Sequence, residues 1–199
     1  DDDVVCPPGW LASVLRAFES PTVNGVSGPS RIPPSHRNHR VLYRYKKFRK
    51  LYDWFFVEPE NLPGHLTQAG TFVPDPNWGY EGDVQFLEAC NMSFRTEALK
   101  AIGGFDETYG GIGDWSEPDC CFRLRQQFPT QRLWFSPTAG VEHRPSQGGA
   151  YVKRRPQSWI RLHNYYQFAN RWVKPSLRHT LYRVFLRTYY TGSYYGWWG

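Results

Sequence analysis

The sequence predicts an α/β fold with many loops, followed by C-terminal helices. Short apolar runs of strand character alternate with stretches of helical period. The 18 Gly and 16 Pro residues punctuate the chain with turns, which is unlike a helical bundle. A length of 199 residues, 18% of them aromatic, is enough for one sizeable core.

The first part of the chain predicts a helix and a strand. Apolar residues recur at helical spacing from Trp10 to Phe18, after a turn at residues 7–9. Val23–Ser27 is expected to form a short strand that stops at Gly28. Residues 31–78 are basic, then aromatic, then rich in Pro and Gly. We expect a helix from about Val41 to Phe56, and the remainder as a long loop that selects the acceptor.

The middle of the chain predicts alternating short elements. Val84–Ala89 is apolar enough for a buried strand, and a helix runs from Ser93 or Arg95 through Lys100 to a cap at residues 103–104. A capping box, with Ser116 as N-cap and Asp119 at N3, opens the next helix. Pro118 suits its first turn. Two short strands and two C-terminal helices are then expected: Arg132–Phe135, Ala139–Glu142, Gln157–Trp172 and Ser176–Tyr190.

Charge is unevenly distributed along the chain. Residues 151–199 contain nine Lys and Arg and no acidic residue, and residues 31–50 contain eight and none. Subtracting the nine from the 24 basic residues leaves 15 against 18 acidic ones in the rest of the chain. Such basic segments attract phosphate, whether in nucleotides, nucleic acid or anionic lipid.

The cysteines indicate a reducing compartment. Cys6, Cys90, Cys120 and Cys121 form no CxxC pair, so neither a structural zinc site nor a disulfide framework is expected. No uncharged apolar run is long enough to cross a bilayer. We expect a cytoplasmic protein, with peripheral contact to the inner face of the membrane as an open possibility.

Polar residues cluster in residues 90–123, CNMSFRTEALKAIGGFDETYGGIGDWSEPDCCFR. This run combines an Asn–Ser–Arg turn, a double Gly, a Phe-Asp-Glu triplet and a carboxylate-rich helix start, a density that indicates a site. Three carboxylates, Asp1, Asp2 and Asp3, precede the apolar pair at residues 4–5. Such a cluster can hold a divalent cation, although alone it is more often a solvated turn.

Five blocks, in order and at matching spacing, resemble the second half of a family 2 glycosyltransferase with the GT-A fold. They are DDD with PPGWL, then ACNMSFR, GGFDE, SEPDCCFRLR and VEH, and they span residues 1–143. The resemblance implies a partial GT-A, Rossmann-like fold. Residues 1–155 would form the C-terminal half of the catalytic domain, and residues 156–199 a basic aromatic helical tail. The half that binds the nucleotide base is not in this sequence, so we expect the chain alone to be inactive.

The resemblance also implies a reaction. A nucleotide-sugar donates its sugar, with inversion, to a glycan, lipid-linked or other acceptor hydroxyl. Mg²⁺ or Mn²⁺, held by the DxD carboxylates Asp1 and Asp3 with His143 as a further ligand, would neutralise the leaving diphosphate. A carboxylate must deprotonate the acceptor hydroxyl. By position in the family motif this base is Glu117, with Asp119 in reserve.

The remaining site residues are expected to contact the donor or the acceptor: Asp2, Ala89, Asn91, Asp106, Glu107, Trp115 and Ser116. Structural alternatives stay open for several of them. Asn91 could be a turn residue, Trp115 a core residue, and Asp106 the cap of a turn. Asp119 fits an ion pair with Arg123 four residues later.

Three residues depart from the family pattern: Ser116, Pro118 and Ala89. They keep open a non-catalytic sugar- or nucleotide-binding module with a degenerate site. The tail admits two interpretations, a helix pair packed on the body or a membrane-surface element rich in Trp, Tyr and Arg. Nucleic-acid binding ranks below both, because no RNA- or DNA-binding motif is present, and we expect no nucleic-acid partner.

Overall fold

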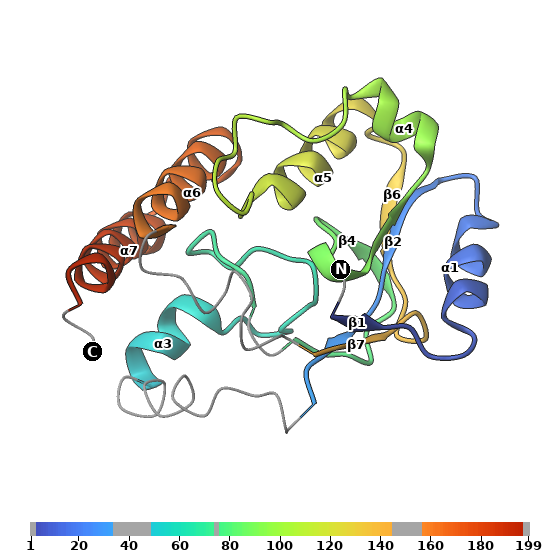
Figure 1. Cartoon of the computed structure of the whole chain (residues 1–199), viewed down its shortest axis with the longest axis horizontal. Coiled ribbons are helices and arrows are strands. Elements are labelled where there is room, and N and C mark those ends of the chain that lie inside the picture. Colours follow the sequence, from blue (N-terminus) through green and yellow to red (C-terminus); the bar gives the residue numbers. More distant parts are fainter. Residues whose placement is uncertain (1–2, 34–48, 74–75, 145–156, 197–199) are drawn as a thin grey trace.

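The computed structural model describes residues 3–33, 49–73, 76–144 and 157–196, and it is a mixed α/β fold (Figure 1). Within these residues, two small sheets are accompanied by six α-helices. Helix α1 covers one side of the larger sheet and α5 the other, and α6 and α7 lie beyond α5. The predicted α/β class is therefore confirmed.

The larger sheet has the strand order β4–β6–β2–β5. Strands β2 (Val23–Ser27) and β6 (Arg132–Phe135) pair in parallel at its centre, and all five residues of β2 are buried. β4 (Gly82–Val84) and β5 (Met92–Phe94) pair antiparallel at the two edges. The β2 sequence VNGVS, with two valines and small or short polar residues, fits such a central position, which is covered on both faces.

The smaller sheet continues the two central strands. Chain segments leaving β2 and β6 form β3 (Ser30–Arg31) and β7 (Val141–His143), which pair in parallel, and β1 (Val4–Val5) pairs antiparallel with β7. Gly28 makes the first continuation possible, because a Cβ there would lie 2.4 Å from the backbone oxygen of Ala139. The smaller sheet thus lies at the carboxyl ends of the parallel strands, where α/β proteins place ligands.

Two apolar cores hold the helices on the larger sheet. α5 (Ser116–Gln127) contributes Cys121 and Leu124, which pack with Leu133 and Phe135 of β6. On the opposite side, α1 (Trp10–Phe18) buries Val14 against β2. The short α4 (Thr96–Ala101) and the 3₁₀ turn η2 (Ala89–Asn91) flank β5, and Ala98 of α4 joins the α5 core.

A third, aromatic core joins the C-terminal helices to the body. α6 (Ser158–Trp172) and α7 (Leu177–Tyr195) pack on each other and on α3 (Arg49–Phe56). The ring of Phe55 lies 5.3 Å from that of Tyr182 and 5.5 Å from that of Phe185. Of the two interpretations of the tail, this packing supports a helix pair docked on the body. No helix in the described residues is both long and apolar enough to traverse a bilayer.

Two local predictions were wrong. The strand predicted at 84–89 ends at Val84, because the amides of Gln85 and Phe86 both turn to the carbonyl of Gly64, at 2.8 and 3.0 Å. Ser116 is not the N-cap of α5, since the backbone of Trp115 takes that position. The predicted helix at 41–56 is described only from Arg49, and its earlier residues lie outside the described part.

Candidate functional site

Asp3 and His143 meet although 140 residues separate them in the chain. Antiparallel pairing of β1 with β7 sets Val4 opposite His143, and the amide of Arg144 donates to the carbonyl of Asp3 at 2.7 Å. The Asp3 Oδ1 and His143 Nε2 atoms consequently lie 3.3 Å apart. Both side chains are only partly exposed, 25% for Asp3 and 17% for His143. The pairing thus places two ligand-type groups in a half-buried position.

This pair fits the protein's share of a Mg²⁺ or Mn²⁺ site. Adjacent ligands of an octahedral ion with bonds of about 2.1 Å lie about 3 Å apart, close to the separation seen here. Mg²⁺ is commonly held by one or two carboxylates and completed by water and substrate phosphates. Within the described residues no cluster of three His, Cys, Asp or Glu side chains could hold an ion. The predicted ligand Asp1 and its neighbour Asp2 lie outside them, so metal binding stays a prediction.

Cys90 lies in the electrostatic neighbourhood of Asp3, and Glu88 in that of Cys90, and sequence reasoning missed both. Burial raises the pKa of Glu88 to about 7, against the opposing effect of a hydrogen bond with Ser30. Burial also raises the pKa of the Cys90 thiol, and the nearby carboxylates of Glu88 and Asp3 raise it further. The sequence signal for Glu88 was a single carboxylate inside an apolar run. The strand predicted at 84–89 included this residue without giving it a role.

Glu117 occupies the first turn of α5. A carboxylate is favoured there by the partial positive charge of a helix N-terminus. Burial is nevertheless the largest influence on Glu117 and raises its pKa, and the Asp114 carboxylate adds to the increase. A carboxylate with a raised pKa holds a proton more tightly, which suits a group that must accept one.

Asp119 is fully buried and accepts hydrogen bonds from three side chains. The donors are Arg123 Nε at 2.8 Å, Arg171 Nη1 at 2.8 Å and Trp172 Nε1 at 2.7 Å. The predicted ion pair with Arg123 is thus confirmed. Arg123 also donates to two backbone carbonyls at the end of α4, which ties α5 to that turn. These contacts leave Asp119 shielded from solvent and favour a structural role for it.

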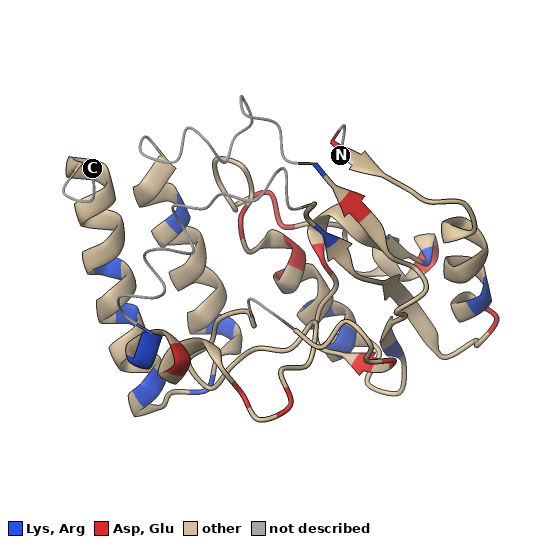
Figure 2. Cartoon of the chain, turned by 90° about the horizontal axis from the view of Figure 1, so that it is seen from below, with Lys and Arg blue, Asp and Glu red and all other residues tan. Residues whose placement is uncertain are grey.

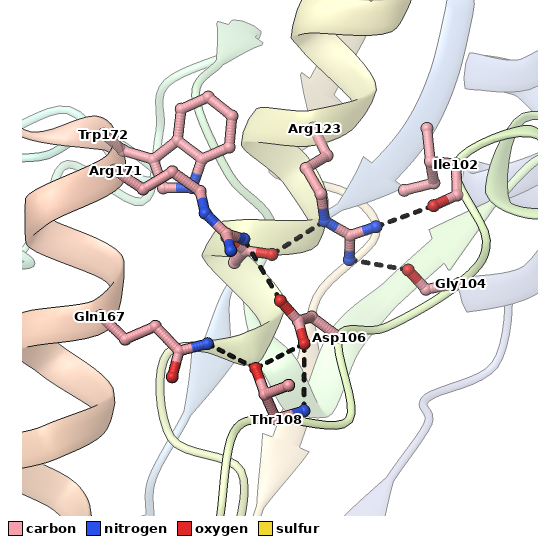
Figure 3. A network of polar contacts seen from close by, with 9 residues as sticks. Ile102, Gly104, Asp106, Thr108, Arg123, Gln167, Arg171 and Trp172 are labelled. Atoms are coloured by element: carbon pink, nitrogen blue, oxygen red, sulfur yellow. Dashed lines mark hydrogen bonds and ion pairs between the residues drawn. The ribbon is translucent and has the colours of Figure 1, made fainter.

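Asp106 belongs to the same network. Its carboxylate accepts from the amide and hydroxyl of Thr108, at 3.0 and 2.6 Å, and from Arg171 at 3.3 Å (Figure 3). The hydrogen bonds from Thr108 lower the pKa of Asp106. Glu107 beside it is exposed. A pocket of about 520 Å³ opens next to this network, and its lining includes Phe105, Gln126 and Trp172.

Asn91 is buried, and its amide joins three parts of the chain. It accepts from Trp10 Nε1 at 3.0 Å and donates to the carbonyls of Gly28 and Ala139, at 2.9 and 2.8 Å. These contacts lock α1 to the loops that lead into β3 and β7. They support the structural alternative, and the role of Asn91 as a substrate contact stays a prediction. Ala89, two residues earlier, is exposed in η2.

The structure relates the two halves of the predicted site through residues 87–91. The amide of Leu87 donates to the Cys121 sulfur of α5 at 3.4 Å, while Cys90 lies in the electrostatic neighbourhood of Asp3. Among the described residues, no hydrogen bond or ion pair joins Glu117 directly to Asp3 or His143. The base candidate and the metal-ligand candidates are therefore related only through this short segment, in which Leu87 and Asn91 are buried and Ala89 is exposed. Trp115 and Ser116 open α5 beside Glu117.

Comparison with known proteins finds relatives among glycosyltransferases. No protein-family model matches the sequence. Pre-mycofactocin glycosyltransferases from two strains of Mycobacterium tuberculosis are each 29% identical to it over 143 residues. The match covers 72% of this chain and 25% of the relatives, so the chain spans about a quarter of their length. The chain is distantly homologous to a glycosyltransferase.

Proposed function

We propose that the protein transfers a sugar from a nucleotide-sugar donor to an acceptor hydroxyl, with inversion and with the help of a divalent cation. The observation that carries the proposal is the meeting of Asp3 and His143, residues far apart in sequence, in a chain homologous to a glycosyltransferase. The two residues, with Asp1, would hold Mg²⁺ or Mn²⁺. When bound, such an ion neutralises the diphosphate leaving group.

In this proposal Glu117 is the general base. Inversion requires the base and the leaving group on opposite faces of the sugar, so Glu117 would act from the side opposite the Asp3–His143 pair. Its carboxylate accepts the proton of the acceptor hydroxyl while the oxygen attacks the anomeric carbon. The buried environment of Glu117 raises its pKa and strengthens it as a base. Asp119, the reserve candidate, has its carboxylate committed to Arg123, Arg171 and Trp172.

Turnover of a donor panel tests this proposal. The intact protein is incubated with UDP-glucose, UDP-galactose and GDP-mannose, with and without Mn²⁺, and release of the nucleoside diphosphate is measured. We expect metal-dependent release from at least one donor, and its loss in Glu117→Gln. Binding of UDP or GDP without turnover of any donor would instead support the non-catalytic binding module. Full activity in Glu117→Gln would remove Glu117 from the base role.

We extend the proposal to a peripheral contact between α7 and an anionic membrane surface. Leu177, Leu181 and Val184 are exposed at 74%, 42% and 60%, and their spacing of four and three residues sets them on one face of the helix. Arg187 is also exposed on α7, in a segment without acidic residues. Co-sedimentation with phosphatidylglycerol vesicles that is lost in Leu177→Glu/Val184→Glu would support this contact. Equal recovery of both proteins in the supernatant would contradict it.

A further inference from the structure

One face of α6 lies along the segment that opens α5. Four side chains share that face because they are spaced four, three and four residues apart: Arg161, Tyr165, Phe168 and Trp172. Each of them contacts a residue between positions 114 and 122. The start of α5 is therefore in contact with α6 along three turns of that helix.

Charged contacts stand at both ends of this interface. Arg161 forms an ion pair with Asp114, and both side chains are mostly buried, with exposures of 15% and 16%. Eleven residues after Arg161, Trp172 Nε1 donates to Asp119 at 2.7 Å, beside the 2.8 Å contact from Arg171. Arg171 also reaches Asp106, so one guanidinium joins the preceding loop to α5 (Figure 3).

Trp115, between the two charged contacts, is held in an unusual conformation. Its φ of 76° lies in the left-handed region, which bulky side chains rarely adopt and which persists only where the surroundings impose it. The indole stacks on Phe72 at 4.3 Å and packs on Tyr165 and Phe168 of α6, at 5.0 and 4.9 Å. Two of the three rings that hold Trp115 thus belong to α6.

The loop before α5 is held by the same helix. Asn164 is buried and pairs with both backbone groups of Gly110, accepting from the amide at 3.2 Å and donating to the carbonyl at 2.9 Å. Gln167 donates to the Thr108 hydroxyl at 2.6 Å. The segment from 106 to 119 therefore contacts α6 at three places: at Thr108, at Gly110 and at the start of α5.

We propose that α6 is the positioning element of the catalytic base, with Arg171 and Trp172 as positioning residues that act on Glu117 through Asp119. Glu117 lies between Trp115 and Asp119 in the chain, and both neighbours are held by α6. Helix α6 is then part of the active-site architecture. This inference rests on the proposed role of Glu117.

The test measures chemistry and local order separately, in the intact protein with the donor and Mn²⁺ that give turnover. Arg171→Ala should lower kcat about 10- to 100-fold, with KM for the donor within about threefold, because a small misplacement of a catalytic group mainly costs rate. Arg171→Lys should recover part of kcat, since it keeps the charge without the planar fork. Trp172→Phe, which removes only the Nε1 donor, should lower kcat in the same direction.

His163→Ala is the matched control, because this residue of α6 is exposed and lies off the contacting face. It should leave kcat unchanged. Hydrogen–deuterium exchange of peptides covering residues 112–124 should be faster in Arg171→Ala than in wild type and in the control. If Arg171→Ala lowers the melting temperature but keeps the wild-type kcat well below that temperature, the role is structural only and the inference is overturned.

Failure of the proposed function has a different signature. If no donor is turned over by the wild type, the base assignment falls, and exchange at residues 112–124 alone decides whether α6 orders the start of α5. Faster exchange in Arg171→Ala would keep that part of the inference, whereas unchanged exchange would overturn it.

Discussion

Replacing Asp119 with Asn separates a buried structural carboxylate from a catalytic one. The side chain is 0% exposed and is surrounded by donors from Arg123, Arg171 and Trp172 at 2.7–2.8 Å. Asn keeps the shape and one acceptor oxygen, but it removes the negative charge and brings an amide group toward a guanidinium. The substitution therefore leaves Arg123 without its buried counter-charge and Arg171 with Asp106 as its carboxylate partner.

The expected loss of stability follows from these contacts. Removing one partner of a buried ion pair costs roughly 3–5 kcal/mol when the other charge stays buried. The side chains of Arg123 and Arg171 are 21% and 41% exposed, so water can solvate part of their charge. We therefore expect about 2–3 kcal/mol for Asp119→Asn. In a domain of this size that lowers the melting temperature by roughly 4–12 °C.

Thermal unfolding followed by circular dichroism measures this shift, and α3 supplies a matched control. Arg49 and Asp53 also form an i,i+4 pair, at 3.6 Å, with side chains 80% and 46% exposed. Asp53→Asn should change stability by less than about 0.5 kcal/mol. A melting temperature of Asp119→Asn within 1 °C of wild type would refute the buried-pair argument. A kcat loss above about 10³-fold with unchanged stability would make Asp119 the base.

Four further predictions concern the site and its surroundings. Glu117→Gln should lower kcat by about 10²- to 10⁴-fold with little change in melting temperature, and wild-type kcat should rise with pH as Glu117 ionises, above the ordinary value of 4.5; a pH-independent kcat would contradict this. Asp3→Asn should raise the Mn²⁺ concentration needed for half-maximal donor turnover at least tenfold, whereas Asp53→Asn should not. Glu88→Gln should raise the stability of the folded state by up to about 3 kcal/mol at pH 8 but not at pH 4. A carboxyl whose folded pKa is raised to about 7 stabilises the fold fully below pH 4.5, and this stabilisation is lost as pH rises through 7. Equal effects of the substitution at both pH values would exclude burial as the cause of the raised pKa. Asp106→Asn should flatten the fall of melting temperature below about pH 4, because a lowered folded pKa gives stability that is present above the ordinary 3.8 and lost as pH falls; an unchanged acid profile would count against it.

The sequence predicted those elements whose pattern is local. β2 and β6 have the predicted bounds, because each is a short apolar run that ends at a strong turn signal. The helices predicted at 157–172 and 176–190 correspond to α6 and α7, and the latter continues to Tyr195. The strand predicted at 84–89 failed because a distant carbonyl, that of Gly64, takes two of its amides. No periodicity in the local sequence reports such a competitor.

The motifs predicted which residues of the candidate site lie near each other better than they predicted what each residue does there. Strand pairing brings Asp3 and His143, two of the expected metal ligands, to within 3.3 Å of each other, whereas their binding of a metal and the convergence of Glu117 with them stay predictions. The environment of Asn91 could not be predicted, because its partners lie 48 to 81 residues away in the chain. That of Asp106 was predicted in part: its contacts with Thr108, two residues later, fit the turn cap that the sequence left open, whereas Arg171 lies 65 residues away. Asn91 pairs with one side chain and two backbone carbonyls, and Asp106 with one backbone amide and two side chains. The residue type alone does not predict whether such a partner is backbone or side chain.

The charge segregation of the sequence has an internal explanation. Figure 2 shows Lys and Arg positions along α6 and α7 and Asp and Glu positions in the neighbouring body segments, and three arginines of the two helices form ion pairs with such acidic residues. Arg161 pairs with Asp114, Arg171 with Asp119, and Arg178 with Glu58 at 3.1 Å.

Ion pairs within the chain therefore explain these three arginines of the basic tail, and an external phosphate is not needed to account for them. If binding to oligonucleotides or anionic vesicles depends on the tail, it must use the other basic residues. Arg187→Ala should then weaken vesicle binding. Arg178→Ala, which breaks the contact with Glu58, should lower the stability of the fold and leave vesicle binding unchanged. The reverse result would mean that the ion pairs seen here open when the tail meets a charged surface.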